Sequence, residues 1–307
     1  MKFFKRLKRF IKNPEILIKW FLLNIINQKK NFWSSQNKRD IKAALPSAIR
    51  DISNFKELLS KKIPFCFVRF SDGEMEIIKN RFLKIKPGET YFRGKKFKNN
   101  YPTYDSKEFN PSIHSKIRDD LIETAIKSKA NYFKGIPTSH NTKTNDRDLM
   151  LLLNGGLDEY ITFSDLLMNS NYKYFRTEIL PLFKNYASKY LIANYRSKPK
   201  RELKNFVHIK IGDNFFSNYE TAKLNLINEL KDIPKQSLII SSASSMSNII
   251  GFYIYNLRPD ITFLDIGSSL NDLLRLDFNI RSYHNSYFKK DIKSKFSKLN
   301  PSYRIRW

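Results

Sequence analysis

Short apolar runs alternate with longer amphipathic segments over most of the chain, from about residue 46 to residue 287. The short runs are rich in β-branched and aromatic residues, which predicts buried strands. The longer segments repeat apolar side chains at helical spacing, which predicts helices packed by one face. Predicted strands begin near residues 65, 132, 159, 189, 206, 237 and 262, and predicted helices occupy 46–61, 111–129, 172–186, 222–230 and 246–257. Such alternation predicts an α/β domain, a Rossmann-like parallel sheet with flanking helices.

Two terminal regions do not follow this pattern. Residues 1–45 contain a basic amphipathic stretch (Met1–Lys12), an apolar stretch (Glu15–Asn27) and a polar linker, whereas residues 288–307 form a basic tail. The apolar stretch is shorter than the roughly 20 apolar residues of a membrane span, and no small-residue cleavage site follows it. We therefore expect a cytoplasmic protein whose N-terminal helices lie on the anionic inner face of the membrane. The alternative is a helical pair packed on the domain.

The segment 82–111 shows neither period and is rich in Lys, Gly, Pro, Tyr and Asn. We therefore predict a long irregular segment here. Loops of this length are often functional. Its aromatic and basic side chains would cover a sugar phosphate, or would form a solvated charge run: Tyr91, Phe92, Arg93, Lys95, Lys96, Phe97, Lys98, Tyr101 and Tyr104.

Two carboxylates follow the predicted strand 65–70 at once, in a loop ahead of the next helix. In open α/β sheets, ligands bind in the crevice outside the carboxyl ends of the strands. Asp72 and Glu74 can share one Mg²⁺ or Mn²⁺ while diphosphate oxygens complete its octahedron. Gly73 would allow a bend between them, and Arg69 would pair with a carboxylate or a phosphate. The alternative is a polar turn in which Asp72 caps the helix.

Other predicted strands also end in polar residues. Asp213 and Asp265 each follow a strand and are candidates to orient a hydroxyl or to act as a general base, as is Glu76. The alternative for each is a structural or capping carboxylate. A hydroxyl-rich loop before the helix 246–257 would let phosphate approach backbone N–H groups at the helix N-terminus, through Ser241, Ser242, Ser244 and Ser245. This loop has no dinucleotide or P-loop glycine pattern, so ordinary dinucleotide or ATP binding is not supported.

Three further residues are weaker candidates. Arg281 and His284 follow the last predicted strand at a distance and would meet a diphosphate. His140 follows the strand 132–137 and would touch substrate, although a single histidine in a loop more often has no such role.

The run Val68-Arg69-Phe70-Ser71-Asp72-Gly73-Glu74 resembles the Arg-aromatic-Gly-Asp-Gly-Glu signature of the GT-D-type bacterial glycosyltransferases, the former family DUF1792. Ser71 stands where that family usually has glycine. The strand end 135–137 (Gly-Ile-Pro) and the strand, small-residue loop, helix and Asp-Ile-Gly over 237–267 are also similar to the family, which commonly has glycine where Ser242 and Ala243 stand. The resemblance covers roughly residues 64–283.

This resemblance implies transfer of a sugar from a nucleotide-diphosphate sugar to a cell-surface glycan or glycoprotein acceptor. It implies Asp72 and Glu74 as the pair that holds Mn²⁺ or Mg²⁺ and the diphosphate. Within it, we take Asp72, Glu74, Asp265 and Asp213 as the catalytic candidates. The nucleotide-sugar-binding candidates are Arg69, Ser241, Ser242, Ser244, Ser245, Arg281 and His284.

Charge and cysteine content add less. The formal net charge of +27 favours an anionic partner, such as nucleic acid, anionic lipid or a phosphorylated substrate. Because Lys is abundant together with Asn, Ile and Phe, the charge is weak evidence for nucleic acid. The single cysteine, Cys66, excludes an intrachain disulfide and fits a reducing compartment.

Two alternative functions stay open. A SAM-dependent methyltransferase would use 263–268 as a cofactor loop, although such a loop normally opens a Rossmann domain instead of closing it. A basic protein that binds nucleic acid or an anionic surface is supported by charge and aromatic content alone.

Overall fold

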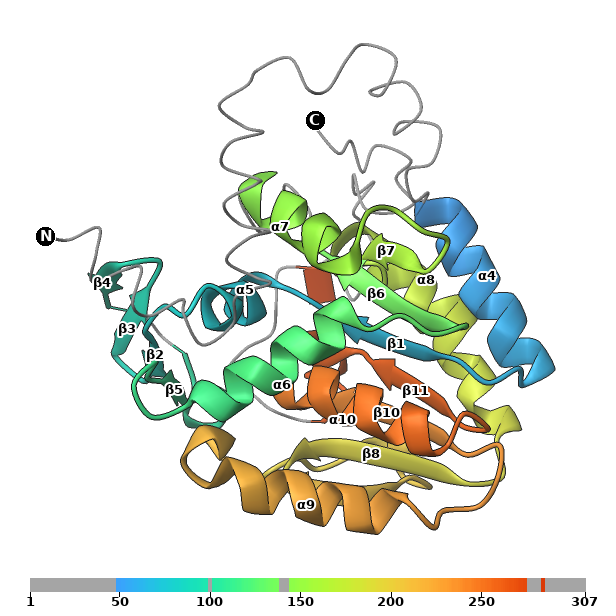
Figure 1. Cartoon of the computed structure of the whole chain (residues 1–307). Coiled ribbons are helices and arrows are strands. Elements are labelled where there is room, and N and C mark those ends of the chain that lie inside the picture. Colours follow the sequence, from blue (N-terminus) through green and yellow to red (C-terminus); the bar gives the residue numbers. More distant parts are fainter. Residues whose placement is uncertain (1–47, 99–100, 138–143, 275–282, 285–307) are drawn as a thin grey trace, which may run out of the picture.

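The computed structural model describes residues 48–98, 101–137, 144–274 and 283–284, which form a three-layer α/β/α domain with a smaller sheet beside it (Figure 1). The predicted N-terminal helices, His140, Arg281 and the basic tail lie outside the described residues. Within the described ranges, no helix is both long enough and apolar enough to cross a bilayer.

The central layer is a seven-stranded sheet in the order β7-β6-β1-β11-β10-β8-β9, and every neighbouring pair is parallel. This confirms the predicted α/β class. The first and last strands of the sheet, β1 and β11, are neighbours, with Cys66 opposite Phe263. The strands are β1 (Cys66–Arg69), β6 (Tyr132–Ile136), β7 (Ile161–Phe163), β8 (Lys189–Asn194), β9 (Val207–Ile211), β10 (Leu238–Ser242) and β11 (Thr262–Asp265).

Helices cover both faces of this sheet, and each face has its own hydrophobic core. Cys66 and Val68 of β1 belong to one core with side chains of α5, α6, α7, α9 and α10, whereas Phe65 and Phe67 belong to the other with side chains of α4 and of 172–183. The period of two along a strand sends alternate side chains to opposite faces. The helices are α4 (Ala48–Lys61), α5 (Asp72–Ile78), α6 (Ser115–Ile126), α7 (Thr144–Asn154), α8 (Tyr172–Tyr174), α9 (Tyr219–Leu230) and α10 (Ser245–Leu257).

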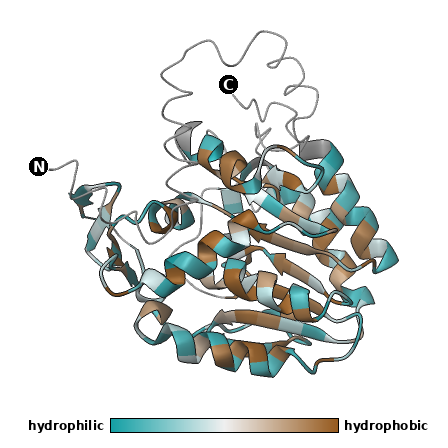
Figure 2. Cartoon of the chain, in the orientation of Figure 1, coloured by the Kyte–Doolittle hydropathy of each residue, from teal (hydrophilic) through white to brown (hydrophobic). Residues whose placement is uncertain are grey.

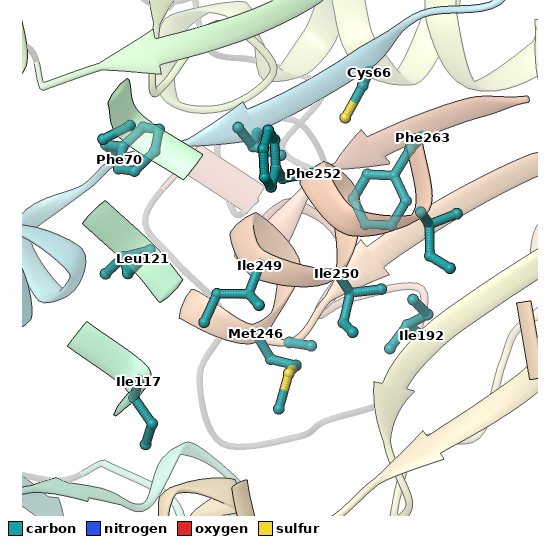
Figure 3. Close-up of a cluster of buried hydrophobic side chains, with 14 of the residues drawn as sticks. Cys66, Phe70, Ile117, Leu121, Ile192, Met246, Ile249, Ile250, Phe252 and Phe263 are labelled. Atoms are coloured by element: carbon teal, nitrogen blue, oxygen red, sulfur yellow. The ribbon is translucent and has the colours of Figure 1, made fainter. Parts of the chain in front are cut away.

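Helix α10 packs against β1 and β11 without an intervening side chain at Gly251. A Cβ there would lie 2.7 Å from the Phe263 ring and 2.8 Å from Val68 Cγ1. Figure 3 shows Ile249, Ile250 and Phe252 of this helix among the apolar side chains of the core. The N-terminus of α10 is therefore fixed relative to the ends of the central strands.

The segment 82–111 is not irregular, as the sequence predicted, but contains a four-stranded antiparallel sheet in the order β4-β3-β2-β5. Its strands are β2 (Leu83–Lys86), β3 (Glu89–Phe92), β4 (Lys95–Phe97) and β5 (Lys107–Phe109). The β3–β4 turn consists of Arg93 and Gly94, both at positive φ (53° and 76°), which is typical of a two-residue hairpin. The strands are only three or four residues long, so the alternation of side chains repeats too few times to be recognised in the sequence.

Two other helical predictions need correction. Helix α5 begins at Asp72, so the two carboxylates lie in its first turn and not in a loop before it. Helix α7 was not predicted at all. The stretch predicted as a helix over 172–186 is α8 followed by a wider turn at Phe175–Ile179 and tighter turns at Leu180–Asn185.

Candidate active site

A cleft of about 350 Å³ lies at the carboxyl edge of the parallel sheet. Residues at or just after the ends of β1, β8, β9, β10 and β11 line one side, and side chains of the small antiparallel sheet line the other. In Figure 1 the small sheet lies beyond the end of β1, next to α5. The cleft is therefore where ligands bind in open α/β sheets.

Asp72 and Glu74 line this cleft from the first turn of α5. Glu74 Oε2 accepts a hydrogen bond from the Ser71 N–H (3.0 Å), and Asp72 Oδ1 accepts one from the Gly73 N–H (3.0 Å). The N-cap residue is therefore Ser71, Glu74 completes its capping box, and Asp72 does not have the capping role that was considered for it. Gly73 adopts helical backbone, and a Cβ at this position would have nothing within 4 Å, so a bend at glycine is not what separates the carboxylates.

The donor set at these carboxylates fits an ion that is shared with a ligand. Asp72 Oδ2 and Glu74 Oε1 take part in no hydrogen bond among the described residues. Burial raises the pKa of Glu74, and the charge of Lys107 opposes that rise. In the described part of the chain, no group of three or more His, Cys, Asp or Glu side chains is placed so that it could hold a metal ion by itself. Mg²⁺ commonly binds one or two carboxylates and completes its shell with water and phosphate oxygens.

Arg69 enters the cleft from the end of β1 and is held from the end of β11. Its Nη2 lies 3.2 Å from Asp265 Oδ1, and its Nη1 lies 3.4 Å from the Ser164 carbonyl oxygen. Gly267 leaves room for this side chain: its φ is +56°, and a Cβ there would be 1.8 Å from Arg69 Nη2. Two segments that were singled out separately in the sequence thus form one unit.

Asp265 is bound to Arg69 and is not among the residues that line the cleft. Its side chain is 3% exposed. Burial raises the pKa of its carboxyl, and the Arg69 guanidinium works against that rise. The structure therefore favours a structural role for Asp265 over the predicted base.

Of the four serines predicted to bind phosphate in the loop before α10, two line the cleft. Ser242 and Ser244 line the cleft, whereas Ser241 and Ser245 are fully buried. Ser241 Oγ lies 2.8 Å from Ser247 Oγ inside the domain. Ser244 has φ 51° and ψ −144°, a conformation that favours glycine.

Lys107 is a cleft residue that the sequence analysis missed. It belongs to β5 of the small sheet, and its Nζ lies 3.2 Å from Ser244 Oγ, next to the N-terminus of α10. Its charge also reaches Glu74. A single lysine in a lysine-rich segment is not distinguished from its neighbours by sequence. The alternation of apolar and polar residues in β2 and β5 was also too short to predict these strands.

Three other predicted residues lie away from the cleft or face elsewhere. Asp213 accepts hydrogen bonds from Asn194 Nδ2 (2.7 Å) and Arg196 Nη2 (2.6 Å), and its neighbours in the chain, not Asp213 itself, line the cleft. Glu76 is buried, with Arg81 Nη1 at 3.3 Å from its Oε1. His284 is fully buried.

The His284 ring packs against Tyr172 and Tyr283, with ring centroids 4.7 and 4.4 Å away. It is not among the cleft-lining residues, whereas Tyr283 is. A diphosphate contact by His284 is therefore not supported by its position.

One face of the small sheet forms an aromatic and apolar wall of the cleft. Ile85, Thr90 and Phe97 lie side by side in register, and all three line the cleft together with Phe92. The opposite face is charged and carries ion pairs, such as Lys96 with Glu89 at 3.0 Å. Of the aromatic and basic residues that were predicted to cover a ligand, only aromatic ones line the cleft among the described residues, namely Phe92, Phe97, Tyr101 and Tyr104.

Comparisons with known proteins were made against families, curated proteins and solved structures. No family model matches the chain, and no curated protein matches it. One solved structure, described as a new glycosyltransferase (DUF1792) from Streptococcus sanguinis, matches with 15% identity and a TM-score of 0.44, over 70% of this chain and 79% of that chain.

Two further structures match with 14% identity and a TM-score of 0.43, over 73% of this chain and 77% of each of those chains. One is described as domain of unknown function 1792, and the other as that domain with a distinct glycosyltransferase fold. The descriptions of all three structures name DUF1792, the family whose signature the residues 69–74 resemble. At these identities and TM-scores the activity has to be inferred from the cleft itself.

Proposed function

We propose that this protein is a glycosyltransferase that transfers a sugar from a nucleotide-diphosphate sugar to a glycan or glycoprotein acceptor. One observation carries the proposal: the cleft brings two carboxylates, Asp72 and Glu74, together with two cations, Arg69 and Lys107, at the N-terminus of α10. Carboxylates and cations side by side suit a ligand that is anionic and carries a divalent ion. A sugar nucleotide is such a ligand.

The diphosphate would occupy the end of the cleft near α10. Backbone N–H groups and the positive end of the helix dipole favour an anion there, and Lys107 and Arg69 add full charges. Such fixed charges stabilise the negative charge that develops on the leaving diphosphate. A Mg²⁺ or Mn²⁺ ion held by Asp72 and Glu74 would supply Lewis-acid assistance to the same group.

The aromatic wall would receive the flat parts of the substrates. Phe92, Phe97, Tyr101 and Tyr104 offer ring faces for a base or for the C–H face of a sugar. Apart from Asp72 and Glu74, the carboxylate among the described lining residues is Asp105. We propose Asp105, in place of Asp213 or Asp265, as the candidate that accepts the proton of the acceptor hydroxyl.

The alternatives receive less support from the cleft. A cofactor loop at 263–268 would need open space around Gly267, and the Arg69 side chain fills that space. The aromatic residues of the small sheet face a cleft of about 350 Å³, which is small beside a groove that tracks the backbone of several nucleotides. We keep a cytoplasmic protein at the inner face of the membrane as a prediction, since residues 1–45 lie outside the described residues.

The test is binding and transfer with a panel of nucleotides. Thermal stability and calorimetry are measured with UDP, GDP, CMP and their sugars, with and without Mn²⁺, on the wild type and on Asp72→Asn/Glu74→Gln. We expect a stabilisation that requires Mn²⁺ and is lost in the double variant, and a loss of sugar transfer of about a hundredfold or more, as for other groups that stabilise transition-state charge.

Asp119→Asn is the matched control, because Asp119 is an exposed acid on α6 outside the cleft. Absence of any nucleotide effect on the wild type would contradict the proposal. Stabilisation that persists in Asp72→Asn/Glu74→Gln would keep the nucleotide but remove these residues as ion ligands. Steeply salt-dependent binding of nucleic acid without an ion would favour the alternative function.

A further inference from the structure

The environment of the Arg69 guanidinium is more elaborate than an ion pair. The Arg69 carbonyl oxygen accepts a hydrogen bond from Asn248 Nδ2 of α10 at 2.7 Å, so the end of β1 is attached to that helix. The side chain is bound by Asp265 and Ser164, and Gly267 lies against its outer nitrogen. Three separate parts of the chain therefore hold Arg69: α10 binds its carbonyl oxygen, and the segments at 164–168 and 265–267 contact its side chain.

This arrangement leaves hydrogen-bonding capacity for a ligand. A guanidinium has five N–H donors in a fixed plane. The Asp265 carboxylate, the Ser164 carbonyl oxygen and, more weakly, the Met168 sulfur each receive one of those from Arg69, which leaves two. Arg69 Nε makes no hydrogen bond among the described residues. A buried cation with unused donors is costly unless an anion completes its shell.

We propose that Asp265 and Gly267 are positioning residues that hold the Arg69 guanidinium in the orientation in which it binds a diphosphate. Asp265 supplies the charge that keeps the guanidinium in place, and Gly267 supplies the space. The inference rests on the proposed binding of a sugar nucleotide and assigns Asp265 a role other than that of a base. A planar guanidinium binds phosphate through two parallel hydrogen bonds, so its orientation matters as much as its charge.

The first test is a double-mutant cycle with inorganic pyrophosphate as the probe. Its affinity is measured by calorimetry with Mn²⁺ for the wild type, Arg69→Ala, Asp265→Asn and the double variant. We expect each single change to weaken binding about tenfold or more, as for hydrogen bonds to charged groups. The double variant should bind about as weakly as Arg69→Ala alone, because Asp265 acts through Arg69.

The second test is chemical rescue, which a merely structural role would not affect. Millimolar guanidinium should restore part of the pyrophosphate affinity of Arg69→Ala, because Asp265 and Gly267 leave a site of matching charge and shape. The same ion should not rescue the double variant Arg69→Ala/Asp265→Asn. Gly267→Ala is an independent variant, in case Asp265→Asn does not fold: its methyl group should displace the side chain and weaken binding as Asp265→Asn does.

The pH profile of sugar transfer separates positioning from base catalysis. If Asp265 positions Arg69, Asp265→Asn should lower the rate without removing the acidic limb of the profile. Additive losses in the cycle, equal rescue of both variants, or loss of the acidic limb would overturn the inference. Absence of pyrophosphate binding by the wild type would overturn it as well, whereas pyrophosphate binding without any sugar transfer would overturn only the proposed function.

Discussion

The two sheets that face each other across the cleft are built in opposite ways. The parallel sheet is buried on both faces except at its edge strand β9. Its strand ends are joined by contacts between distant segments, such as Arg69 with Asp265. The antiparallel sheet has one face toward the cleft and one charged face with ion pairs, and β4 is exposed along its length. Figure 2 shows hydrophobic strands in the former and a mixture of polar and apolar residues in the latter.

This difference indicates a division of labour. The parallel sheet fixes groups such as the Arg69 guanidinium, because a close-packed interior has low compressibility and leaves its side chains little freedom. The antiparallel sheet offers aromatic side chains on a scaffold that tolerates change more easily, since exposed positions contribute less to stability. We therefore expect the parallel sheet to fix the orientation of Arg69, and the aromatic wall of the antiparallel sheet, unlike Lys107 and the nearby Asp105, to determine the choice of substrate.

The largest expected difference between the two sheets is in how one lysine of each affects the pH dependence of the unfolding free energy. Lys134 on β6 is 1% exposed, donates to the Ala125 carbonyl oxygen at 2.9 Å, and has a pKa that burial lowers to about 8. Between this pKa and the ordinary value of 10.5, the unfolded chain holds a proton that the folded protein does not, so stability rises with pH. Relative to Lys134→Met, the wild type should gain up to about 3 kcal/mol of unfolding free energy over that range.

Urea unfolding of both proteins at several pH values measures this difference. Lys84 on β2 is the contrasting residue, because its hydrogen bond to Glu89 raises its pKa. Its contribution is present below the ordinary lysine pKa and is lost as the pH rises through the raised one, so the difference between the wild type and Lys84→Met should change with the opposite sign. A difference in unfolding free energy between the wild type and Lys134→Met that does not change with pH would show that Lys134 is not buried as described.

A methyl group at Gly251 should show how tightly the parallel sheet is packed. Because a Cβ there would press on Phe263 and Val68, Gly251→Ala should lower the unfolding free energy by about 1–3 kcal/mol, as overpacking does. Gly73→Ala is the matched control, since nothing lies within 4 Å of a Cβ at that helical position. Equal stability of the two variants in urea unfolding would contradict the close packing of α10.

Two lysines of the antiparallel sheet should differ in their effect on binding. Lys107 lies next to Ser244 in the cleft, whereas Lys95 is exposed at the tip of the hairpin. Lys107→Ala should weaken nucleotide binding about tenfold, because a charged hydrogen bond to the phosphate is lost. Lys95→Ala should change it less than about twofold, because exposed charges are screened by water and salt. Calorimetry at physiological salt compares them, and equal losses would argue for a general charge effect.

The smallest expected effect concerns the loop before α10. Ser244 has φ 51°, so Ser244→Gly should relieve backbone strain and raise stability by about 1 kcal/mol or less. Ser242→Gly, at a strand residue without positive φ, should instead lower it slightly. Thermal unfolding of the two variants gives the comparison, and a loss of stability in Ser244→Gly would mean that its hydroxyl outweighs the strain.

Much of the large sheet could be predicted because each of its strands leaves a local signal. Apolar runs such as 65–70 and helices such as 246–257 are visible in the sequence alone, and the resulting parallel sheet places all strand ends at one edge. This is why Arg69, Asp72, Glu74 and Ser244 could be selected before their mutual distances were known.

The remaining features depend on contacts that no local pattern contains. The pairing of Arg69 with Asp265 joins residues 196 positions apart and requires β11 to lie beside β1. Lys107 reaches the cleft only because β5 pairs with β2, in strands too short to produce a clear period. Asp213 had the same sequence signal as Asp72, but its neighbours Asn194 and Arg196 bind its carboxylate.

The adjacency of β1 and β11 has a consequence for the newly made chain. A ribosome releases β1 and its carboxylates long before β11, since polypeptides emerge from the N-terminus onward. Until Asp265 and Gly267 have emerged, the Arg69 guanidinium lacks its carboxylate partner, and the position of β11 beside β1 is empty. A nascent or prematurely terminated chain would therefore carry Asp72 and Glu74 without the completed cleft, so we expect it to gain affinity for an anionic ligand only after β11 has taken its place.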